Sequence, residues 1–541
     1  MTDSQDDDVV DFGAARARSS RKRAPAGAGS DYISPPTSGP NGEPVILLVG
    51  GTLPEQADRA VEILSNPRLG IYSRGPSLVR PTIWAAAPPT LRGRSKREAV
   101  QRPEGAVVLA PVDEAALVDV LTREASFKKF DARGKEWIAK DCPTAIAGTI
   151  LARRGHGSSI RPLKQIIRTP CLRSDGTLIS EPGYDEASQL LFVSDLAWPR
   201  MPAEPGLAEC EFAMEILEDA LSSFPFVDKT DLSAALAAMI TAVLRPALST
   251  APLFAITAPS AGTGKSKLAD LAAILATGRV APVISGSVDE AELEKRLGSC
   301  LMAGDPLVCL DNLSGPLRSD LLCSILTQTH VNVRVLGESR NCDLPSIATW
   351  FCTGNNLAIA GDMSRRVCLI RLDAKCERPE DRKFDRDVIA FFLANRAKLV
   401  ISALTVVRGF LIGTKPPVLS AMGSFEDWSE TVRAAIVWTG YADPLGNAAA
   451  LQADNPVRER AMMAFSALKF AGVFTAADIK QRAMRDSSFA DELGDFSGKR
   501  GDFDAHIFGS FLKKAKDQQH GGLTLKQVEG YAGAARWRVT G

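Results

Sequence analysis

The residue types best suited to chemistry lie in one short segment, 258–266, which reads Ala-Pro-Ser-Ala-Gly-Thr-Gly-Lys-Ser. It follows an apolar strand pattern and precedes a helical one, which is the context that a phosphate-binding loop requires. Glycines in such a loop let backbone N–H groups turn toward an anion, and the helix N-terminus adds a positive dipole end. We therefore expect Lys265 to reach the β- and γ-phosphates of ATP and the Ser266 hydroxyl to ligate magnesium. The residues expected to contact the nucleotide are Pro259, Ser260, Ala261, Gly262, Thr263, Gly264, Lys265 and Ser266.

Two features of this pattern depart from the usual one. Pro259 stands where the first glycine is expected, which is tolerable at a strand-to-loop turn because proline fixes φ and needs no donor.

Asp311 ends the apolar strand pattern 307–310 and is the expected second magnesium ligand, although many strands end in aspartate. Many ATPases carry another acid directly after this aspartate, but the residue here is Asn312. Hydrolysis is then slow, or the group that polarises water comes from elsewhere.

Two further polar clusters follow apolar strand patterns. Asn355 comes at the end of the strand expected at 347–352, beside the strand that carries Asp311, where its amide would orient water or contact the γ-phosphate. The alternative is an ordinary Gly-Asn-Asn turn. Arg365 and Arg366 precede the apolar strand 367–372. Either one is a candidate arginine finger that reaches the γ-phosphate of a neighbouring subunit, and the alternative is a pair of surface charges.

These motifs, in this order, resemble the ATPase core of superfamily-three and related AAA+ helicases. More narrowly, the chain resembles the primase-helicase ATPases of phages, plasmids and integrated mobile elements. The narrower resemblance rests on the stretches 137–151, 169–185, 378–382, 424–428 and 438–444. It implies ATP-driven translocation on DNA by a hexameric ring during replication of a mobile element.

Two expectations about nucleic acid go with this resemblance. In ring translocases, a hairpin between the second and third motifs points into the pore and grips the nucleic-acid backbone. Here the apolar runs 331–336 and 347–349 flank a charged segment whose candidate contact is Arg340, although a solvated turn fits equally well. Many relatives also carry a primase domain, but the first 250 residues show no strand-borne Asp-x-Asp pair for the two metals of nucleotidyl transfer. We therefore do not claim primase activity for this chain, which leaves room for a separate primase.

The elements that must position these motifs predict a multidomain α/β protein. Strand and helix signals alternate from 252 to 372, which indicates an AAA+-like parallel sheet covered by helices. Near the C-terminus, a helix start capped by Thr475, a basic helix and two strands suggest a winged-helix-like module, or equally a packing domain with basic solvent residues. Its candidate DNA contacts are Lys513, Lys514 and Lys516. The expected divisions are a tail at 1–43, a mixed α/β domain at 44–205, a helical connector at 206–250, the ATPase core at 251–375, a helical region at 376–455 and the winged-helix-like domain at 456–541.

Composition limits the alternatives. The 541 residues contain 64 basic and 64 acidic side chains, which excludes a uniformly basic nucleic-acid coat but permits a local basic groove. Four histidines and ten scattered cysteines offer no zinc-ligand spacing. The N-terminus lacks a secretory pattern, and the apolar stretch 232–244 is too short to span a bilayer, so we expect a cytoplasmic protein without membrane contact.

The leading hypothesis is an ATP-dependent DNA helicase or translocase that works as a homo-hexamer, with single-stranded DNA in its pore. The alternative is a nucleotide-switched DNA-binding initiator or defence regulator with little hydrolysis, which Asn312 keeps open. A small-molecule phosphotransferase is a weaker third hypothesis. It gives no reason for the paired arginines or for the basic C-terminal helix.

Overall fold

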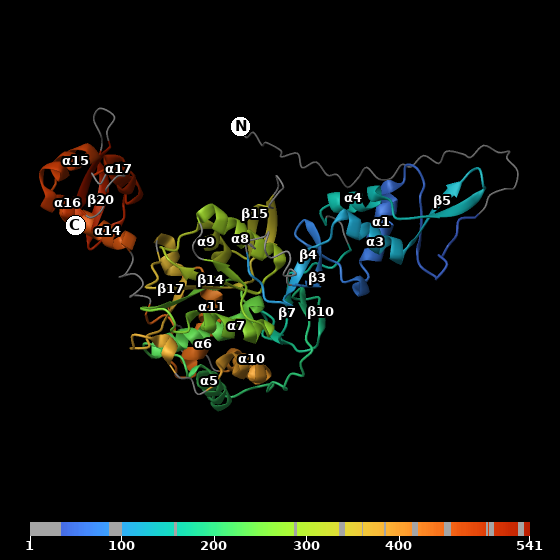
Figure 1. Cartoon of the computed structure of the whole chain (residues 1–541), viewed down its shortest axis with the longest axis horizontal. Coiled ribbons are helices and arrows are strands. Elements are labelled where there is room, and N and C mark those ends of the chain that lie inside the picture. The colour runs from blue at the N-terminus through green and yellow to red at the C-terminus, as the bar shows by residue number, and fades with distance from the viewer. Residues whose placement is uncertain are drawn as a thin grey trace, which may run out of the picture.

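The computed structural model describes a multidomain α/β protein (Figure 1). The described residues are 34–85, 100–155, 159–285, 289–334, 341–359, 361–382, 386–413, 420–447, 456–493, 496, 503–528 and 535–541. Most of the expected tail, and Arg340 with it, therefore lie outside the described residues.

A five-stranded sheet forms the centre of the largest domain. Its neighbouring strands are all paired in parallel. The apolar runs of these strands are buried on both faces, as is usual in a parallel sheet covered by helices. In spatial order, the strands are β13 (Val283–Ser285), β14 (Leu307–Leu313), β17 (Thr349–Asn355), β12 (Leu253–Ala258) and β18 (Val367–Arg371).

Helices that precede the strands of this sheet in the sequence and helices that follow them pack into the same hydrophobic core. Helix α7 follows the candidate phosphate loop and packs against both α6 and α10. The long apolar pattern at 210–244 forms two helices, α5 and α6, rather than one. The helices of this domain are α5 (Leu207–Leu221), α6 (Lys229–Leu244), α7 (Lys265–Thr277), α8 (Glu290–Ala303), α9 (Asp320–Thr327), α10 (Val388–Ile412), α11 (Glu426–Trp428) and α12 (Ala434–Trp438), with shorter turns η2 (Arg245–Ala247), η3 (Gly361–Arg366), η4 (Pro379–Asp381) and the π-helical η5 (Ser429–Arg433).

Helix α10 is the one described helix that is long and apolar enough to cross a membrane by composition. Half of its most apolar 18-residue window is nevertheless buried inside the protein. Its Arg396 donates from Nε to the carbonyl oxygens of Ile274 and Leu275, at 2.8 and 3.0 Å, and so joins α10 to the end of α7. These contacts are those of a helix packed into the core of its domain.

The insert between α9 and β17 is a two-stranded antiparallel hairpin. It pairs β15 (His330–Arg334) with β16 (Asn341–Pro345). The expected return strand at 347–349 is therefore wrong, because the returning strand starts at Asn341 and alternates exposed and buried residues. Thr349 instead begins β17 of the central sheet.

The described N-terminal part contains three further three-stranded sheets, β1-β5-β6, β2-β3-β4 and β10-β11-β7, and one two-stranded sheet, β8-β9. The first pairs β1 in parallel with β5, and β5 with β6 in a hairpin, and packs against three helices. The segment 165–185 forms several short strands. The elements are β1 (Val45–Leu47), α1 (Leu53–Leu64), η1 (Pro67–Leu69), β2 (Tyr72–Arg74), β3 (Ser77–Ile83), β4 (Val107–Pro111), α3 (Glu114–Glu124), β5 (Ser126–Asp131), β6 (Glu136–Lys140), α4 (Thr144–Ala152), β7 (Gln165–Ile167), β8 (Cys171–Leu172), β9 (Leu178–Ile179), β10 (Gly183–Asp185) and β11 (Leu190–Phe192).

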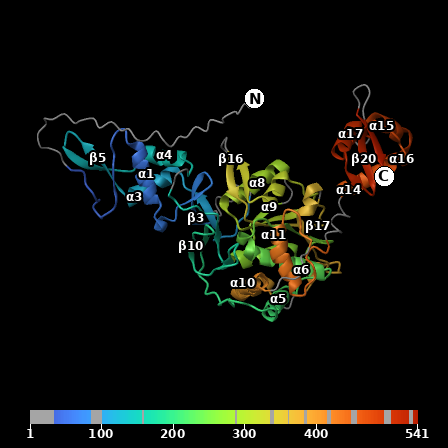
Figure 2. The ribbon, with the colours of Figure 1, turned by 180° about the vertical axis from the view of Figure 1, so that it is seen from behind.

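The C-terminal part has its own hydrophobic cluster and stands apart from the central sheet in both views (Figures 1 and 2). The expected Thr475 cap is confirmed: its side chain accepts a hydrogen bond from the Asp478 backbone N–H, and the Asp478 carboxylate accepts one from the Thr475 backbone N–H. The expected pair of strands is confirmed as an antiparallel ladder. The elements are α14 (Pro456–Leu468), α15 (Ala476–Arg485), α16 (Ser487–Leu493), α17 (Ala505–Lys514), β19 (Gln519–His520), β20 (Leu523–Val528) and β21 (Arg536–Thr540).

Candidate functional site

The candidate phosphate loop, Asp311 and Asn355 lie together at the carboxyl edge of the central sheet. The candidate phosphate loop leaves the end of β12, whose Ala258 pairs in register with Asn355 at the end of β17. Strand β17 also pairs with β14, which carries Asp311, so the adjacency expected for Asn355 is confirmed. Because β17 lies between β12 and β14, the loop, the amide and the carboxylate meet at neighbouring strand ends.

A short chain of hydrogen bonds joins the loop to Asp311. The Ser266 hydroxyl donates to Asp311 Oδ1 at 2.7 Å. The Thr353 hydroxyl donates to the same oxygen at 2.6 Å, and it accepts a hydrogen bond from the Asn312 backbone N–H at 3.0 Å. Thr353 is only 1% exposed, so it fixes this carboxylate from inside the sheet. Sequence reasoning missed Thr353, because a threonine within a strand is also a common β-former.

The strand that carries Asp311 is irregular at this point. The pairing of β14 with β17 shifts register between Leu310 and Leu313, which places Asp311 and Asn312 in a bulge. Asn312 has φ of 57°, in the left-handed region that asparagine tolerates better than most residues. The left-handed backbone at position 312 is therefore one physical reason for an asparagine directly after Asp311.

Ser266 and Asp311 together fit a magnesium ion. Both present oxygen atoms, which magnesium prefers, and the ion commonly keeps several waters while it binds one or two protein groups. No cluster of three or more histidine, cysteine or acidic residues that would suit a transition metal occurs in the described part of the chain. Two protein oxygen donors leave most of the coordination of such an ion to other oxygen ligands.

Lys265 lies in the loop that it is expected to serve. Its ammonium donates to the Ser260 carbonyl oxygen at 2.9 Å and to the Thr263 hydroxyl at 3.2 Å. Burial lowers the pKa of Lys265, and the nearby Asp311 carboxylate opposes that shift. A cation held by two neutral oxygen atoms can exchange them for the stronger, charge-assisted bonds that phosphate offers.

Glycine is required at two loop positions. Gly262 has φ of 75° and Gly264 has φ of 99°, a conformation that side-chain-bearing residues rarely adopt. Neighbours also approach closely: a methyl group on Gly262 would lie 2.9 Å from the Glu380 carboxylate, and one on Gly264 would lie 3.2 Å from the Phe224 ring. Sequence reasoning missed both Glu380 and Phe224, which come from segments far from the loop.

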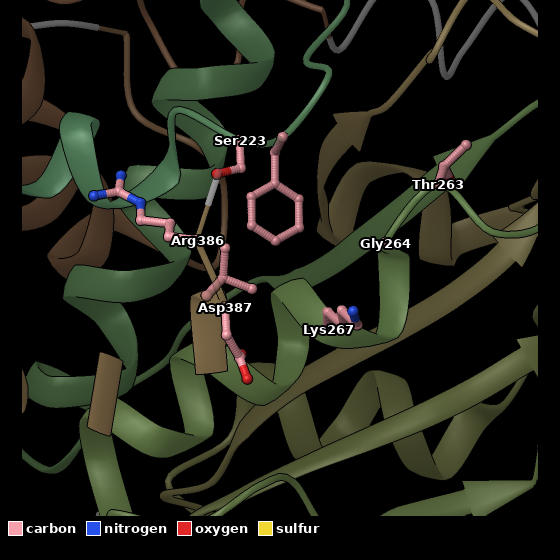
Figure 3. A pocket seen from close by; sticks show the side chains of 8 residues that line it. Ser223, Thr263, Gly264, Lys267, Arg386 and Asp387 are labelled. Atoms are coloured by element: carbon pink, nitrogen blue, oxygen red, sulfur yellow. The ribbon is translucent and has the colours of Figure 1, made fainter. Parts of the chain in front are cut away.

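A cavity of about 350 Å³ opens beside the loop and the first turn of α7. In Figure 3, Arg386 and Asp387 lie on one side and Thr263 on the other. Phe224 and Val388 add apolar surface to the lining. A second cavity of about 450 Å³ lies at the end of β12, where Thr257, Ala258 and Pro259 line it, and its lining contains no aromatic residue.

The paired arginines lie at the opposite edge of the sheet. Val367, the next residue after Arg366, pairs with Leu253 at the start of β12, whereas the loop follows the end of β12. At about 3.3 Å per residue, the six-residue strand separates the two edges by roughly 17 Å. Neither arginine therefore belongs to the phosphate loop of its own chain.

The two arginines differ in exposure. Arg366 is 8% exposed, and its Nη1 donates to the Asp362 carbonyl oxygen at 2.8 Å. Arg365 forms an ion pair with the Asp362 carboxylate and remains exposed. Of the two candidates, Arg365 is the one able to reach outward.

The expected DNA contacts lie far from this site. Lys513 and Lys514 end helix α17, Lys516 follows it, and all three side chains are exposed. The candidate Arg340 lies outside the described residues.

No family model and no curated protein matches this chain. Among solved structures, it is similar to an apo form of the NrS-1 C-terminal region, with 14% identity over 79% of this chain and 99% of that one, at a TM-score of 0.31. It is similar to SCCmec type IV Cch, described as an active helicase, with 13% identity over 87% and 97% of the two chains, at a TM-score of 0.31. The JCV helicase is 13% identical over 43% of this chain and 66% of that one, at a TM-score of 0.22. Similarity at this level establishes neither family nor function, so the geometry of the site has to carry both.

Proposed function

We propose that this chain is an ATP-dependent DNA helicase or translocase with an AAA+-type core, which hydrolyses ATP between the subunits of a ring. The observation that carries the proposal is the hydrogen-bonded chain Ser266–Asp311–Thr353 beside a glycine-rich loop at the carboxyl edge of a parallel sheet. A hydroxyl and a carboxylate preset at hydrogen-bond distance suit the shared magnesium of a nucleoside triphosphate. The role that we infer is cytoplasmic, in the replication of a phage, plasmid or mobile element.

Each residue at the edge then has a distinct task. Backbone N–H groups around Gly262 and Gly264 hold the phosphates, and Lys265 turns from Ser260 toward them. Ser266 and Asp311 hold magnesium, which neutralises charge on the phosphates when it is bound. Asn355, exposed at the end of β17, orients the attacking water or senses the γ-phosphate.

The nucleoside half of ATP fits the cavity beside α7. Phe224 offers a ring on which the base stacks, an interaction that tolerates any base because every base has a π-face. Arg386 and Asp387 are already engaged: Arg386 Nη1 binds Asp219 at 3.1 Å, and the Asp387 carboxylate caps α10. Because these polar groups already have partners, they contribute few hydrogen bonds to the edge of the base. We therefore expect weak selectivity among the four bases.

A neighbouring subunit completes the site. Arg365 is exposed at the sheet edge opposite its own loop, so it serves as an arginine finger only toward another chain. This arrangement requires an oligomer, and a closed homo-hexamer with single-stranded DNA in the pore is our proposal. Asp362 holds Arg365 until the interface forms.

The basic residues beyond the core supply DNA contacts in this proposal. Lys513, Lys514 and Lys516 lie on and after a helix that is followed by a β-hairpin, a winged-helix-like arrangement. The hairpin β15–β16 would line the pore, and Arg340, which lies between its two strands in the sequence, is the candidate contact with the nucleic-acid backbone. A primase, if the system needs one, is a separate chain.

One observation favours a second candidate, a nucleotide-switched DNA-binding initiator or regulator. Asn312 occupies the position after the magnesium-binding aspartate, and its left-handed backbone would strain most replacements. A site without that acid binds ATP and hydrolyses it slowly.

Steady-state ATP turnover with and without single-stranded DNA tests the proposal and separates the two candidates. A motor shows turnover that single-stranded DNA stimulates and that Lys265→Ala abolishes. Tight ATP binding without stimulated turnover favours the switch. Turnover that survives Lys265→Ala would refute the site assignment.

A further inference from the structure

The N-terminal hairpin β5–β6 has features that the nucleotide site does not use. Strand β1 pairs only with Ser126–Lys128 of β5, so the outer part of the hairpin continues as a two-stranded ribbon. Both views show this ribbon extending beyond helices α1, α3 and α4 (Figures 1 and 2). Its residues are poorly placed to stabilise the fold, because they extend past the helices that cover the sheet.

The ribbon carries an aromatic pair on one face. Phe130 and Trp137 are directly opposite each other in the ladder, and their ring centroids lie 5.3 Å apart in an edge-to-face arrangement. Phe130 is 40% exposed, and Trp137 is half-buried. An aromatic pair kept at the surface on a protruding ribbon offers π-faces to a partner rather than to the core.

Charge is divided between the two faces of the ribbon. Residues 126–140 contain five basic and two acidic side chains. Both acids, Asp131 and Glu136, are opposite each other in register, on the face that points away from the aromatic pair. Lys129 and Lys140 lie on the same face as these acids, whereas the aromatic face carries Lys128 and no acid.

Arginine and lysine at the turn add to this charge. Arg133 and Lys135 lie in the turn, which the Asp131 carboxylate stabilises by accepting hydrogen bonds from the backbone N–H groups of Arg133 and Gly134. That carboxylate is thus used in the turn. Along the ribbon, the aromatic pair therefore lies between Lys128 on one side and the turn with Arg133 and Lys135 on the other.

We propose that this ribbon is a second nucleic-acid site, which binds single-stranded nucleic acid by stacking bases on Phe130 and Trp137 and by pairing phosphates with Lys128 and the turn cations. Stacked aromatics flanked by basic side chains are how proteins hold single strands without reading their sequence. The site lies in a different sheet from the nucleotide loop, so it binds without ATP. It delivers a single strand to the chain independently of the motor site.

The test measures binding of the full-length chain to a fluorescent oligonucleotide of about ten nucleotides, without ATP, in DNA and RNA forms. The double variant Phe130→Ala/Trp137→Ala should bind at least about thirtyfold more weakly, since it removes two stacking contacts and each stacked base contributes on the order of 1–3 kcal/mol. The matched control is Phe212→Ala, which removes a phenylalanine that is 63% exposed on α5. Trp137→Phe should retain most of the affinity, because it keeps an aromatic face.

An abasic oligonucleotide separates stacking from a general structural effect. The wild-type chain should lose affinity when the bases are removed, and the double variant should lose much less. Lys128→Ala should lower the salt dependence by about 0.7 in log–log slope, unlike the exposed Lys295→Ala. A difference in affinity between the wild type and the double variant, with either the DNA or the RNA oligonucleotide, supports the proposal and identifies which nucleic acid the ribbon binds.

Two results would overturn the inference. One is a double variant that binds both strands as tightly as Phe212→Ala does. The other is an equal effect of base removal on the wild type and the double variant. A chain that binds through the ribbon but never hydrolyses ATP would instead refute the motor proposal and leave this inference standing.

Discussion

Thr353→Val isolates the hydroxyl that holds Asp311 in place. The replacement removes a 2.6 Å hydrogen bond to the carboxylate and leaves the Asn312 backbone N–H without its acceptor. A hydrogen bond to a charged group contributes about 1.5–3 kcal/mol, so we expect the free energy of unfolding to fall by about that amount. Groups that orient metal ligands typically contribute about 10–100-fold to metal affinity, and we expect a loss of that size for magnesium.

The assay is ATP turnover as a function of magnesium concentration, together with denaturant unfolding. Thr353→Ser should restore much of both, because it keeps the hydroxyl. The same strand offers a matched control in Thr349, which is fully buried and whose hydroxyl has no hydrogen-bond partner among the described residues. Thr349→Val should be neutral or stabilising. If Thr353→Val behaves like Thr349→Val in both measurements, the role assigned to this hydroxyl is wrong.

Three more outcomes follow from the structure. Arg365→Ala should not turn over ATP when it is assayed by itself. Mixed with Lys265→Ala, it should regain part of the turnover, since each variant supplies the half-site that the other lacks. Mixtures that stay inactive would contradict a shared site. Phe224→Ala should raise the KM for ATP and for GTP by similar factors, whereas a selective effect would contradict stacking as the main contact with the base. Arg173 holds the pKa of Asp185 well below its usual range, so the stability that this pair provides is present above the unfolded pKa of about 4 and lost as the pH falls below it. Melting temperatures of wild type and Asp185→Asn should therefore differ at pH 7 and converge in acid, and a constant difference would show that the carboxylate is not the cause.

Local patterns in the sequence were sufficient for the loop and its neighbours. The apolar run before Ala258, the glycines of the loop and the helical spacing after Ser266 each act within a few residues, and all three elements occur in the structure. The strand ending near Asp311 and its neighbour ending at Asn355 were predictable for the same reason.

Features that depend on distant contacts were not predictable. The approach of Phe224 and Glu380 to the loop joins segments far apart in the chain, and nothing near either residue signals it. The bulge at Asn312 depends on pairing with β17. The return strand from Asn341 was missed because its alternating pattern is weaker than the apolar run after it.

Calorimetric titration of the full-length chain with ATP and magnesium tests the central claim most directly. The account predicts one ATP per chain, and a loss of affinity of about tenfold or more in Lys265→Ala, since charge-assisted hydrogen bonds contribute about 1.5–3 kcal/mol. Equal affinities for the wild type and Lys265→Ala, or no binding by the wild type, would contradict it.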